Sequence, residues 1–166
     1  MKKLLSMLAI TVASTVFAGE LAIKGNFQRP RKPGLPPAGW NRISGGKGTL
    51  ELIQSAEGNS VMLSADAGMR FGIYSQPAAA KAGDKVKVTA FVRGEKVILG
   101  IFQYSTPSGT TAQRQTVTAT PEGKEVEAVF TVNDTNKGKT DRIRVCLLVD
   151  KDGAASFTNV KAVTVE

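Results

Sequence analysis

The residue types that usually carry enzyme chemistry are scarce in this chain. Its 166 residues include no histidine and a single cysteine, Cys146. Without histidine there is no histidine-based catalytic triad, no histidine general base and no histidine-ligated zinc. One cysteine cannot form an internal disulfide, a cysteine-rich zinc site or an iron–sulfur cluster. We expect Cys146 to be a small buried apolar residue, because no histidine is present to activate its thiol.

The acidic residues do not predict a hydrolytic centre either. Glycoside hydrolases use a pair of carboxyl groups. Most of the 14 Asp and Glu residues lie at predicted turns, and Glu51, Glu125 and Glu127 lie in predicted strands. Their spacing marks no catalytic pair, although residues distant in the sequence could meet in the fold. Lyases that cut acidic polysaccharides often use Tyr, His or Lys, so the absence of histidine weakens that alternative. The chain is predicted not to be an enzyme.

Tyrosine, glutamine and arginine are the residues best suited to bind a ligand. The candidate ligand contacts lie in predicted strands and are Arg70, Tyr74, Gln76, Tyr104, Arg114 and Arg144. Planar polar side chains can hydrogen-bond neighbouring sugar hydroxyls, and Arg can bind a carboxylate or sulfate through two bonds. In the alternative interpretation the tyrosines cap the edge of the core with their hydroxyls in water. The arginines then pair with Glu125 or Glu127, which would stabilise the fold by about 0–1 kcal/mol.

Short alternating segments rich in Val, Ile, Thr and Phe are the elements that must position these residues. No segment after residue 20 keeps helical spacing for more than two turns. The predicted strands are 21–27, 49–55, 60–65, 69–76, 85–93, 96–104, 111–118, 124–132, 142–149 and 156–165. About ten strands at even spacing predict an all-β jelly-roll sandwich with two antiparallel sheets.

Two of these strands show which side faces the core. In 85–93 alternate residues are aliphatic, and in 142–149 one face is entirely aliphatic. The opposite face of 142–149 combines two arginines with apolar groups: Arg142, Arg144, Cys146 and Leu148. Such a mixture is typical of a half-buried concave surface rather than of a face fully exposed to water.

The segment 28–47 differs from the rest of the chain in composition. It contains four of the seven prolines, the only tryptophan and no acid. Its basic residues are Arg29, Arg31, Lys32, Arg42 and Lys47. The rest of residues 19–166 is nearly neutral, with 15 Lys and Arg against 14 Asp and Glu. We expect a long loop within the domain that is the place for an anionic partner; the alternative is simply solvated charge. Trp40 could stack on a sugar, but we expect it to close one end of the core.

The first residues predict an export signal. An apolar run over 4–17 follows two lysines, and Val16 and Ala18 place small residues at positions −3 and −1 of a cleavage site. The run is shorter than the roughly 20 residues that cross a membrane, and no later segment is long and apolar enough to span one. We expect cleavage after Ala18 and a secreted or periplasmic domain over 19–166, which lowers the formal charge from +8 to +6. The alternative is an uncut N-terminal anchor.

Short motifs spread over nearly all of residues 19–166 point to a family. They read Leu-Ala-Ile-Lys-Gly-Asn-Phe-Gln at 21–28, Pro-Ala-Gly-Trp at 37–40, Tyr-Ser-Gln at 74–76, Ala-Gly-Asp at 82–84, Phe-Val-Arg at 91–93 and Ala-Ser-Phe-Thr-Asn-Val at 155–160. Together they resemble the galactose-binding-like jelly rolls, notably carbohydrate-binding modules of the CenC type. The resemblance implies a jelly-roll fold and a carbohydrate-binding role.

The chain departs from this family at the place of its structural calcium ion. Family members often bind calcium between the first and last strands with a Glu after the opening Phe and an Asp in the closing motif. Gln28 and Thr158 stand at these positions here. Because calcium prefers several oxygen ligands, with carboxylates supplying the charge, a calcium site there is doubtful, and we expect no cofactor or metal.

The sequence therefore predicts an exported, non-catalytic carbohydrate-binding domain whose partner is a polysaccharide or glycoconjugate and not nucleic acid. Tyr, Gln and Arg would hold the glycan on a concave sheet face, and the positive net charge favours an acidic glycan over a neutral one. The alternative is a structural or assembly subunit of the cell envelope or extracellular matrix that self-associates and binds no sugar. The scarcity of Trp and Tyr, on which sugars usually stack, favours the alternative.

Overall fold

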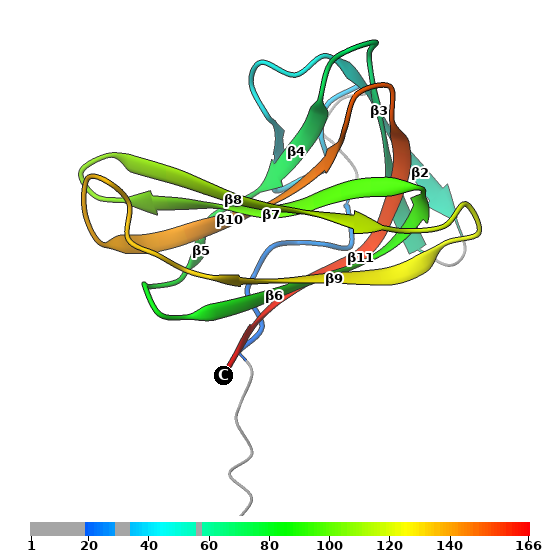
Figure 1. The fold of residues 1–166 in the computed structure, drawn as a ribbon. Helices are drawn as coiled ribbons and strands as arrows, with labels where there is room; N and C mark the ends of the chain where they lie inside the picture. Colours follow the sequence, from blue (N-terminus) through cyan, green and yellow to red (C-terminus); the bar gives the residue numbers. More distant parts are fainter. Residues whose placement is uncertain (1–18, 29–33, 56–57) are drawn as a thin grey trace, which may run out of the picture.

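A computed structural model describes residues 19–28, 34–55 and 58–166 of the chain (Figure 1). The predictions for the export signal over 1–18 and for Arg29, Arg31 and Lys32 lie outside the described residues. Within these ranges the regular structure is entirely strand, and no helix long and apolar enough to cross a membrane is found there.

The strands form two antiparallel sheets that lie face to face (Figure 1). Sheet I has the order β1-β4-β10-β7-β8, with β5 also paired to β10, and sheet II has the order β2-β3-β11-β6-β9. The strands of sheet I are β1 (Trp40–Arg42), β4 (Phe71–Ser75), β5 (Ala78–Ala79), β7 (Lys96–Ser105), β8 (Gly109–Thr118) and β10 (Thr140–Val149). Those of sheet II are β2 (Gly48–Ser55), β3 (Gly58–Ala65), β6 (Lys85–Gly94), β9 (Lys124–Thr131) and β11 (Ala154–Val165). The predicted jelly-roll sandwich is confirmed.

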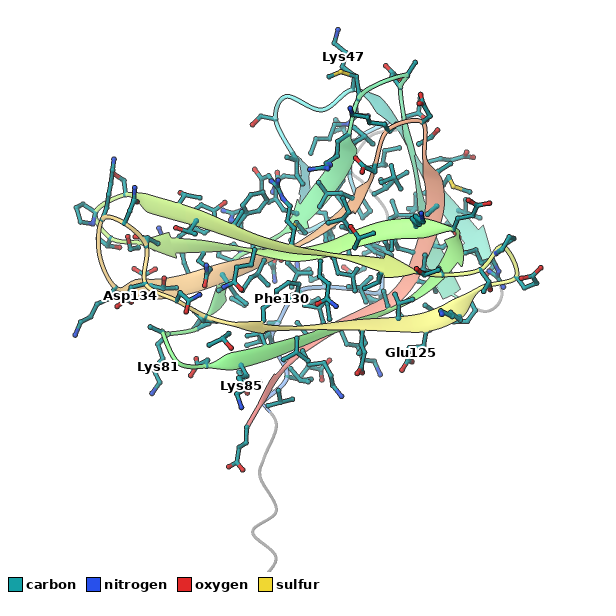
Figure 2. The ribbon with its side chains drawn as sticks, in the orientation of Figure 1. Lys47, Lys81, Lys85, Glu125, Phe130 and Asp134 are labelled. Atoms are coloured by element: carbon teal, nitrogen blue, oxygen red, sulfur yellow. The ribbon has the colours of Figure 1, made fainter. Side chains whose placement is uncertain are left out.

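The core lies between the two sheets. The aliphatic faces predicted for 85–93 and 142–149 both point into it, and Val86, Val92, Ile143 and Leu147 have no exposed surface. Figure 2 shows Phe130 of β9 directed into the same space. Burying each such side chain contributes roughly 1.5–3 kcal/mol to folding. This two-sided core is what holds the sheets at a fixed distance and leaves their outer faces free.

The predicted strand over 21–27 is wrong. Before β1, only Glu20 forms a bridge, with Val163, and the backbone turns at Lys24 (φ 52°) and Phe27 (φ 47°). Positive φ angles break an extended strand, even though Ile23 and Phe27 alternate into the core as the sequence pattern suggested. The segment instead lies along β11 as an irregular strap.

The strap ties the two ends of the described chain together. The Leu21 amide donates to the Ala162 carbonyl (2.8 Å), and the Thr164 amide donates to the Gly19 carbonyl (3.0 Å). Figure 1 shows the C-terminus beside this strap, below sheet II. The outer face of sheet I lies on the opposite side of the sandwich.

The segment 28–47 is not one continuous loop, because it contains β1. This short strand pairs with β4, so that Trp40 lies opposite Ser75 and Arg42 opposite Ile73. Trp40 is only 4% exposed, its ring centroid lies 5.3 Å from that of Phe27, and its Nε1 donates to the Lys24 carbonyl (3.1 Å). The interpretation of Trp40 as a residue that closes the core is confirmed.

Candidate functional site

Strand register gathers the predicted site residues on the outer face of sheet I. In β10, Arg142 lies opposite Tyr104, Arg144 opposite Phe102, and Cys146 opposite both Gly100 and Tyr74. Since the alternate residues of β10 fill the core, these side chains point outward. Arg114 on β8 lies opposite Gly100 and shares this face.

Aromatic rings and guanidinium groups alternate across this face. The members of this aromatic–arginine row are Tyr74, Phe102, Tyr104, Arg114, Arg142 and Arg144. The Arg144 guanidinium carbon lies 5.0 Å from the ring centroid of Tyr74 and 5.5 Å from that of Tyr104. The Tyr74 and Phe102 rings meet edge to face with centroids 6.1 Å apart. Cation–π contacts of this length are stabilising and hold the arginines in place.

The charges of Arg114 and Arg144 are not neutralised by acidic partners. Within residues 19–28, 34–55 and 58–166, neither guanidinium forms an ion pair. The suggested partners Glu125 and Glu127 lie on β9 in sheet II, where Glu127 is 3.8 Å from the Lys87 ammonium. The interpretation that pairs these arginines with Glu125 or Glu127 is therefore wrong.

The Tyr104 hydroxyl stays neutral at ordinary pH. Burial raises the pKa of Tyr104, and the neighbouring Arg144 charge offsets this shift only in part. A neutral phenol can both donate and accept a hydrogen bond. Tyr74 and Tyr104 are half-buried, so each presents part of its ring as well as its hydroxyl to a ligand.

A small apolar cluster supports the row from below. Ile98, Cys146 and Leu148 are buried there, and Tyr74 and Phe102 pack against them. Burial raises the pKa of the Cys146 thiol to about 12, although the charge of Arg114 acts in the other direction. Cys146 is thus a buried apolar residue, as predicted.

Arg70 and Gln76 lie apart from the row. The Gln76 side-chain amide donates to the Ala22 carbonyl (2.8 Å), and its backbone amide donates to the Gly39 carbonyl (2.6 Å). Through its side-chain bond to Ala22, Gln76 connects the strap to sheet I. Arg70 precedes β4 and forms an ion pair with Asp150 at 3.1 Å, at one end of the face. The structure thus brings Tyr74, Tyr104, Arg114 and Arg144 together, but not Gln76.

Phe102 was not singled out by sequence reasoning, although it lies at the centre of the row. It alternates with Tyr104 along β7, so strand periodicity places both rings on one face. Its contacts with Tyr74 and Arg114 depend on neighbours in β4 and β8. The periodic signal was present, but the contacts that give Phe102 its role come from pairing between strands far apart in the sequence.

Sequence reasoning also missed a hollow on the outer face of sheet II. It has a volume of about 760 Å³ and is lined by Ile53, Ser55, Ser60, Met62, Arg93, Gly94, Pro121 and Ser156. Arg93 stacks over Phe91 at 5.3 Å. Three of the hollow's lining residues are serines, and none is a tyrosine. Its chemistry is less suited to sugar stacking.

Arg42 and Lys47, the basic residues of 28–47 that the structure describes, have different surroundings. The Arg42 guanidinium donates to the Gly34 carbonyl (3.1 Å) and lies 5.4 Å from the Phe71 ring centroid, on the core side of the sheet edge. Lys47 projects into solvent at the tip of a loop above β4 (Figure 2). An anionic site formed by the whole segment remains a prediction.

The residues at the family's calcium position supply little charge. Gln28 is exposed and Thr158 is half-buried on β11. In the described part of the chain, no group of three or more His, Cys, Asp or Glu side chains comes together in a way that could hold a metal ion. The donor set at this position therefore does not fit calcium well.

Comparisons with known proteins support the fold. No protein-family model matches the chain, and no curated protein sequence matches it. A cyclase from Fischerella sp. TAU superimposes with a TM-score of 0.64 at 14% identity, over 89% of this chain and 98% of that one. The family 11 carbohydrate-binding module from Clostridium thermocellum, solved with a β-1,3-1,4-mixed-linked tetrasaccharide, gives 0.57 at 15% identity, over 88% and 96%. The enzymatically active domain of bacteriophage CBA120 tailspike protein 4 gives 0.61 at 11% identity, and this chain spans only 20% of its length. These likenesses show a shared jelly-roll fold.

Proposed function

We propose that this protein is a non-catalytic carbohydrate-binding domain that holds a glycan on the outer face of sheet I. The observation that carries the proposal is Arg144, whose guanidinium is held between two tyrosine rings without an acidic partner among the described residues. The C–H face of a pyranose packs on an aromatic ring. One Arg144 N–H donates to the Ser75 carbonyl (3.4 Å). Its remaining N–H groups and the tyrosine hydroxyls can then bond the hydroxyl groups of the sugar.

The site is ordered before a ligand arrives. Each arginine of the row rests on at least one aromatic ring, and Tyr74 and Phe102 rest on the buried cluster of Ile98, Cys146 and Leu148. Side chains that are already fixed lose little conformational freedom on binding, which favours affinity.

The fold alone does not select this function. The family 11 neighbour was solved with a bound oligosaccharide, which supports the proposal, but a cyclase has the same architecture. Function is therefore argued from the site residues. An exported domain, secreted or periplasmic, is consistent with a polysaccharide partner and is part of the proposal.

The carboxylates near this face favour a role without catalysis. Asp141 and Asp150 stand at the two ends of β10, nine residues and therefore about 30 Å apart in an extended strand. Glycoside hydrolysis by a carboxyl pair needs a separation of about 5–9.5 Å. Each carboxylate is also paired, Asp141 with Arg142 at 3.0 Å and Asp150 with Arg70 at 3.1 Å.

Affinity gel electrophoresis against a panel of neutral and acidic polysaccharides tests the proposal. We expect at least one polysaccharide to retard the protein, and the Tyr74→Ala/Tyr104→Ala variant to bind it about tenfold more weakly, because each ring contributes about 0.5–1.5 kcal/mol. Phe91→Ala on sheet II is the control and should change binding less than about twofold. Thermal unfolding verifies that each variant is folded. Retardation by no member of the panel would reject the proposed function.

A second candidate, an assembly subunit, is favoured by the edge strand β2. Its sequence Gly-Thr-Leu-Glu-Leu-Ile-Gln-Ser contains one charge and neither Lys nor Pro. Natural edge strands usually carry Lys, other charged residues or Pro, which prevent pairing with a strand of another chain. Size-exclusion chromatography with light scattering tests this candidate, and a monomer at all concentrations would reject it.

A further inference from the structure

A hollow of about 220 Å³ lies at the Arg70 end of the outer face of sheet I. Its lining consists of Ile43, Ser44, Gly45, Gly46, Arg70, Gly72, Arg114 and Leu148. Gly72 and Leu148 come from neighbouring strands β4 and β10, whereas the loop after β1 supplies one rim. The hollow therefore continues the aromatic–arginine row, with Arg114 belonging to both.

Two glycines allow the loop to approach the sheet so closely. The Ile43 amide donates to the Gly72 carbonyl (3.0 Å), which brings the loop against β4. A Cβ atom at Gly72 would lie 2.7 Å from Leu148 Cγ, and a Cβ atom at Gly46 would lie 2.5 Å from the Arg70 carbonyl oxygen. A side chain at either position would push the loop away or fill the space, so the hollow depends on glycine there.

The hollow carries an excess of positive charge. Arg70 is held by Asp150, with both Nε and a terminal nitrogen 3.1 Å from the same carboxylate oxygen. Arg70 lowers the pKa of the Asp150 carboxyl, which stays ionised at neutral pH. Arg114 is held differently, over the Phe102 ring at 5.7 Å, and forms no ion pair with the described residues. Two guanidinium groups thus face a space near a single carboxylate.

We infer that this hollow is an anion-selective subsite, in which Arg114, with Arg70 beside it, binds the carboxylate of a uronic acid residue in the glycan. The inference rests on the proposed function and names its substrate class. A carboxylate matches the planar fork of an arginine side chain, which can donate two parallel hydrogen bonds. The partly exposed side chain of Ile43 can pack against the carbon face of the same sugar ring.

This inference gives the predicted preference for acidic glycans a local cause. The sequence offered the net charge, the basic segment 28–47 and the general ability of strand arginines to bind a carboxylate as reasons. In the structure, the selective charge belongs to Arg114 on β8 and Arg70 before β4, both outside that segment. Arg70 is paired with Asp150 and Arg114 is not, so the two arginines should attract an anion to different degrees. Their contributions can therefore be tested separately.

The test uses polygalacturonate, alginate and hyaluronan, each paired with its carboxyl-reduced neutral derivative, and measures affinity by isothermal titration calorimetry. The wild-type protein should bind at least one acidic member about tenfold more tightly than its reduced partner. Arg114→Gln should remove that preference, because it should weaken binding of the acidic member about tenfold more than binding of its neutral partner. Arg114→Lys should retain part of the preference for the acidic glycan, because lysine keeps the positive charge. It should not retain all of it, because lysine lacks the planar fork that donates two parallel hydrogen bonds.

Two further variants add an expected gain of affinity and a matched control. Asp150→Asn should strengthen acidic binding severalfold, because it frees Arg70 from its carboxylate. Arg93→Gln removes the same charge from sheet II and should leave both affinities unchanged. Equal wild-type affinity for acidic and neutral partners, or an equal effect of Arg114→Gln on both, overturns the subsite and leaves the glycan-binding function standing. Failure of every glycan to bind, in this set and in the panel above, overturns the function itself.

Discussion

The outer faces of the two sheets each carry four Lys or Arg residues on their strands. On sheet I they are Lys96, Arg114, Arg142 and Arg144, and on sheet II they are Lys85, Lys87, Arg93 and Lys161. The strand positions of sheet I that face outward contain no acid, whereas those of sheet II contain Glu51, Glu125 and Glu127. Figure 2 shows Lys85 and Glu125 pointing away from the core on the side of sheet II. The formal charge excess is therefore +4 on one face and +1 on the other.

The aromatic residues follow the same division. Tyr74, Phe102 and Tyr104 lie together on sheet I, and Phe91 lies on sheet II. Neither the net charge nor the number of aromatic residues therefore indicates where a sandwich can bind a ligand. What matters is how the charged and aromatic residues are divided between the two outer faces, and strand register determines that division.

The largest expected effect concerns the thiol beneath the row on sheet I. With a pKa of about 12, only about one part in 10⁴ of Cys146 is thiolate at pH 8, against about a quarter for an ordinary cysteine. Alkylation by iodoacetamide should be more than about a thousandfold slower in the folded protein than in urea, and should accelerate as the pH rises. Mass spectrometry measures both rates. Similar rates in the folded and unfolded protein would show that the side chains packed over Cys146 do not shield its thiol from the reagent.

Replacing two adjacent leucines of β10 compares the two sides of sheet I. Leu147 is fully buried between the sheets, and Leu148 is 2% exposed in the small outer cluster. Leu147→Ala should lower the free energy of unfolding by about 3–5 kcal/mol and Leu148→Ala by about 2–3 kcal/mol, since the smaller cluster can relax around the cavity. Urea denaturation measures both values. A greater loss for Leu148→Ala would mean that the outer cluster, not the inter-sheet core, holds β10 in place.

Neutralising two charges on either face tests the asymmetry directly. Arg142→Gln/Arg144→Gln and Lys85→Gln/Lys161→Gln change the net charge equally. In a polygalacturonate affinity gel at low salt, the first pair should weaken binding about tenfold and the second less than about twofold. Raising the salt concentration should reduce the difference. Equal losses would show that binding follows net charge and not the sheet I face.

The smallest expected effect concerns the ion pair on sheet II. The Lys87 ammonium and the Glu127 carboxylate are 3.8 Å apart, with Glu127 largely exposed and Lys87 half-buried. Lys87→Gln should change the free energy of unfolding by less than about 0.5 kcal/mol, or the melting temperature by less than about 2 °C. Differential scanning calorimetry is sufficient to measure this. A larger shift would mean that sheet II also depends on its surface charges.

The sandwich could be predicted because alternation in 85–93 and 142–149 directly reports the core face. The irregular strap could not, because the positive φ angles at Lys24 and Phe27 accompany hydrogen bonds that the strap makes with β11. The individual members Tyr74, Tyr104 and Arg144 were predicted from residue type and strand face. A shared sheet face was predicted as well, but the contacts between their side chains were not, because those contacts require three strands far apart in the sequence to pair in one register. Gln76 was misplaced for the same reason, since the Ala22 carbonyl that accepts its amide is distant in the sequence.

The strap that joins residues 19–27 to β11 also determines how the domain can be connected to other chains. Because Gly19 is hydrogen-bonded to Thr164, a short peptide could link residue 166 to residue 19 without disturbing either sheet. A circular permutant opened at an exposed turn such as 151–153 would then keep the fold. Residues 19 and 166 lie on the side of the sandwich opposite the outer face of sheet I (Figure 1). A domain joined at residue 166, or in place of the residues before 19, would therefore leave the outer face of sheet I accessible.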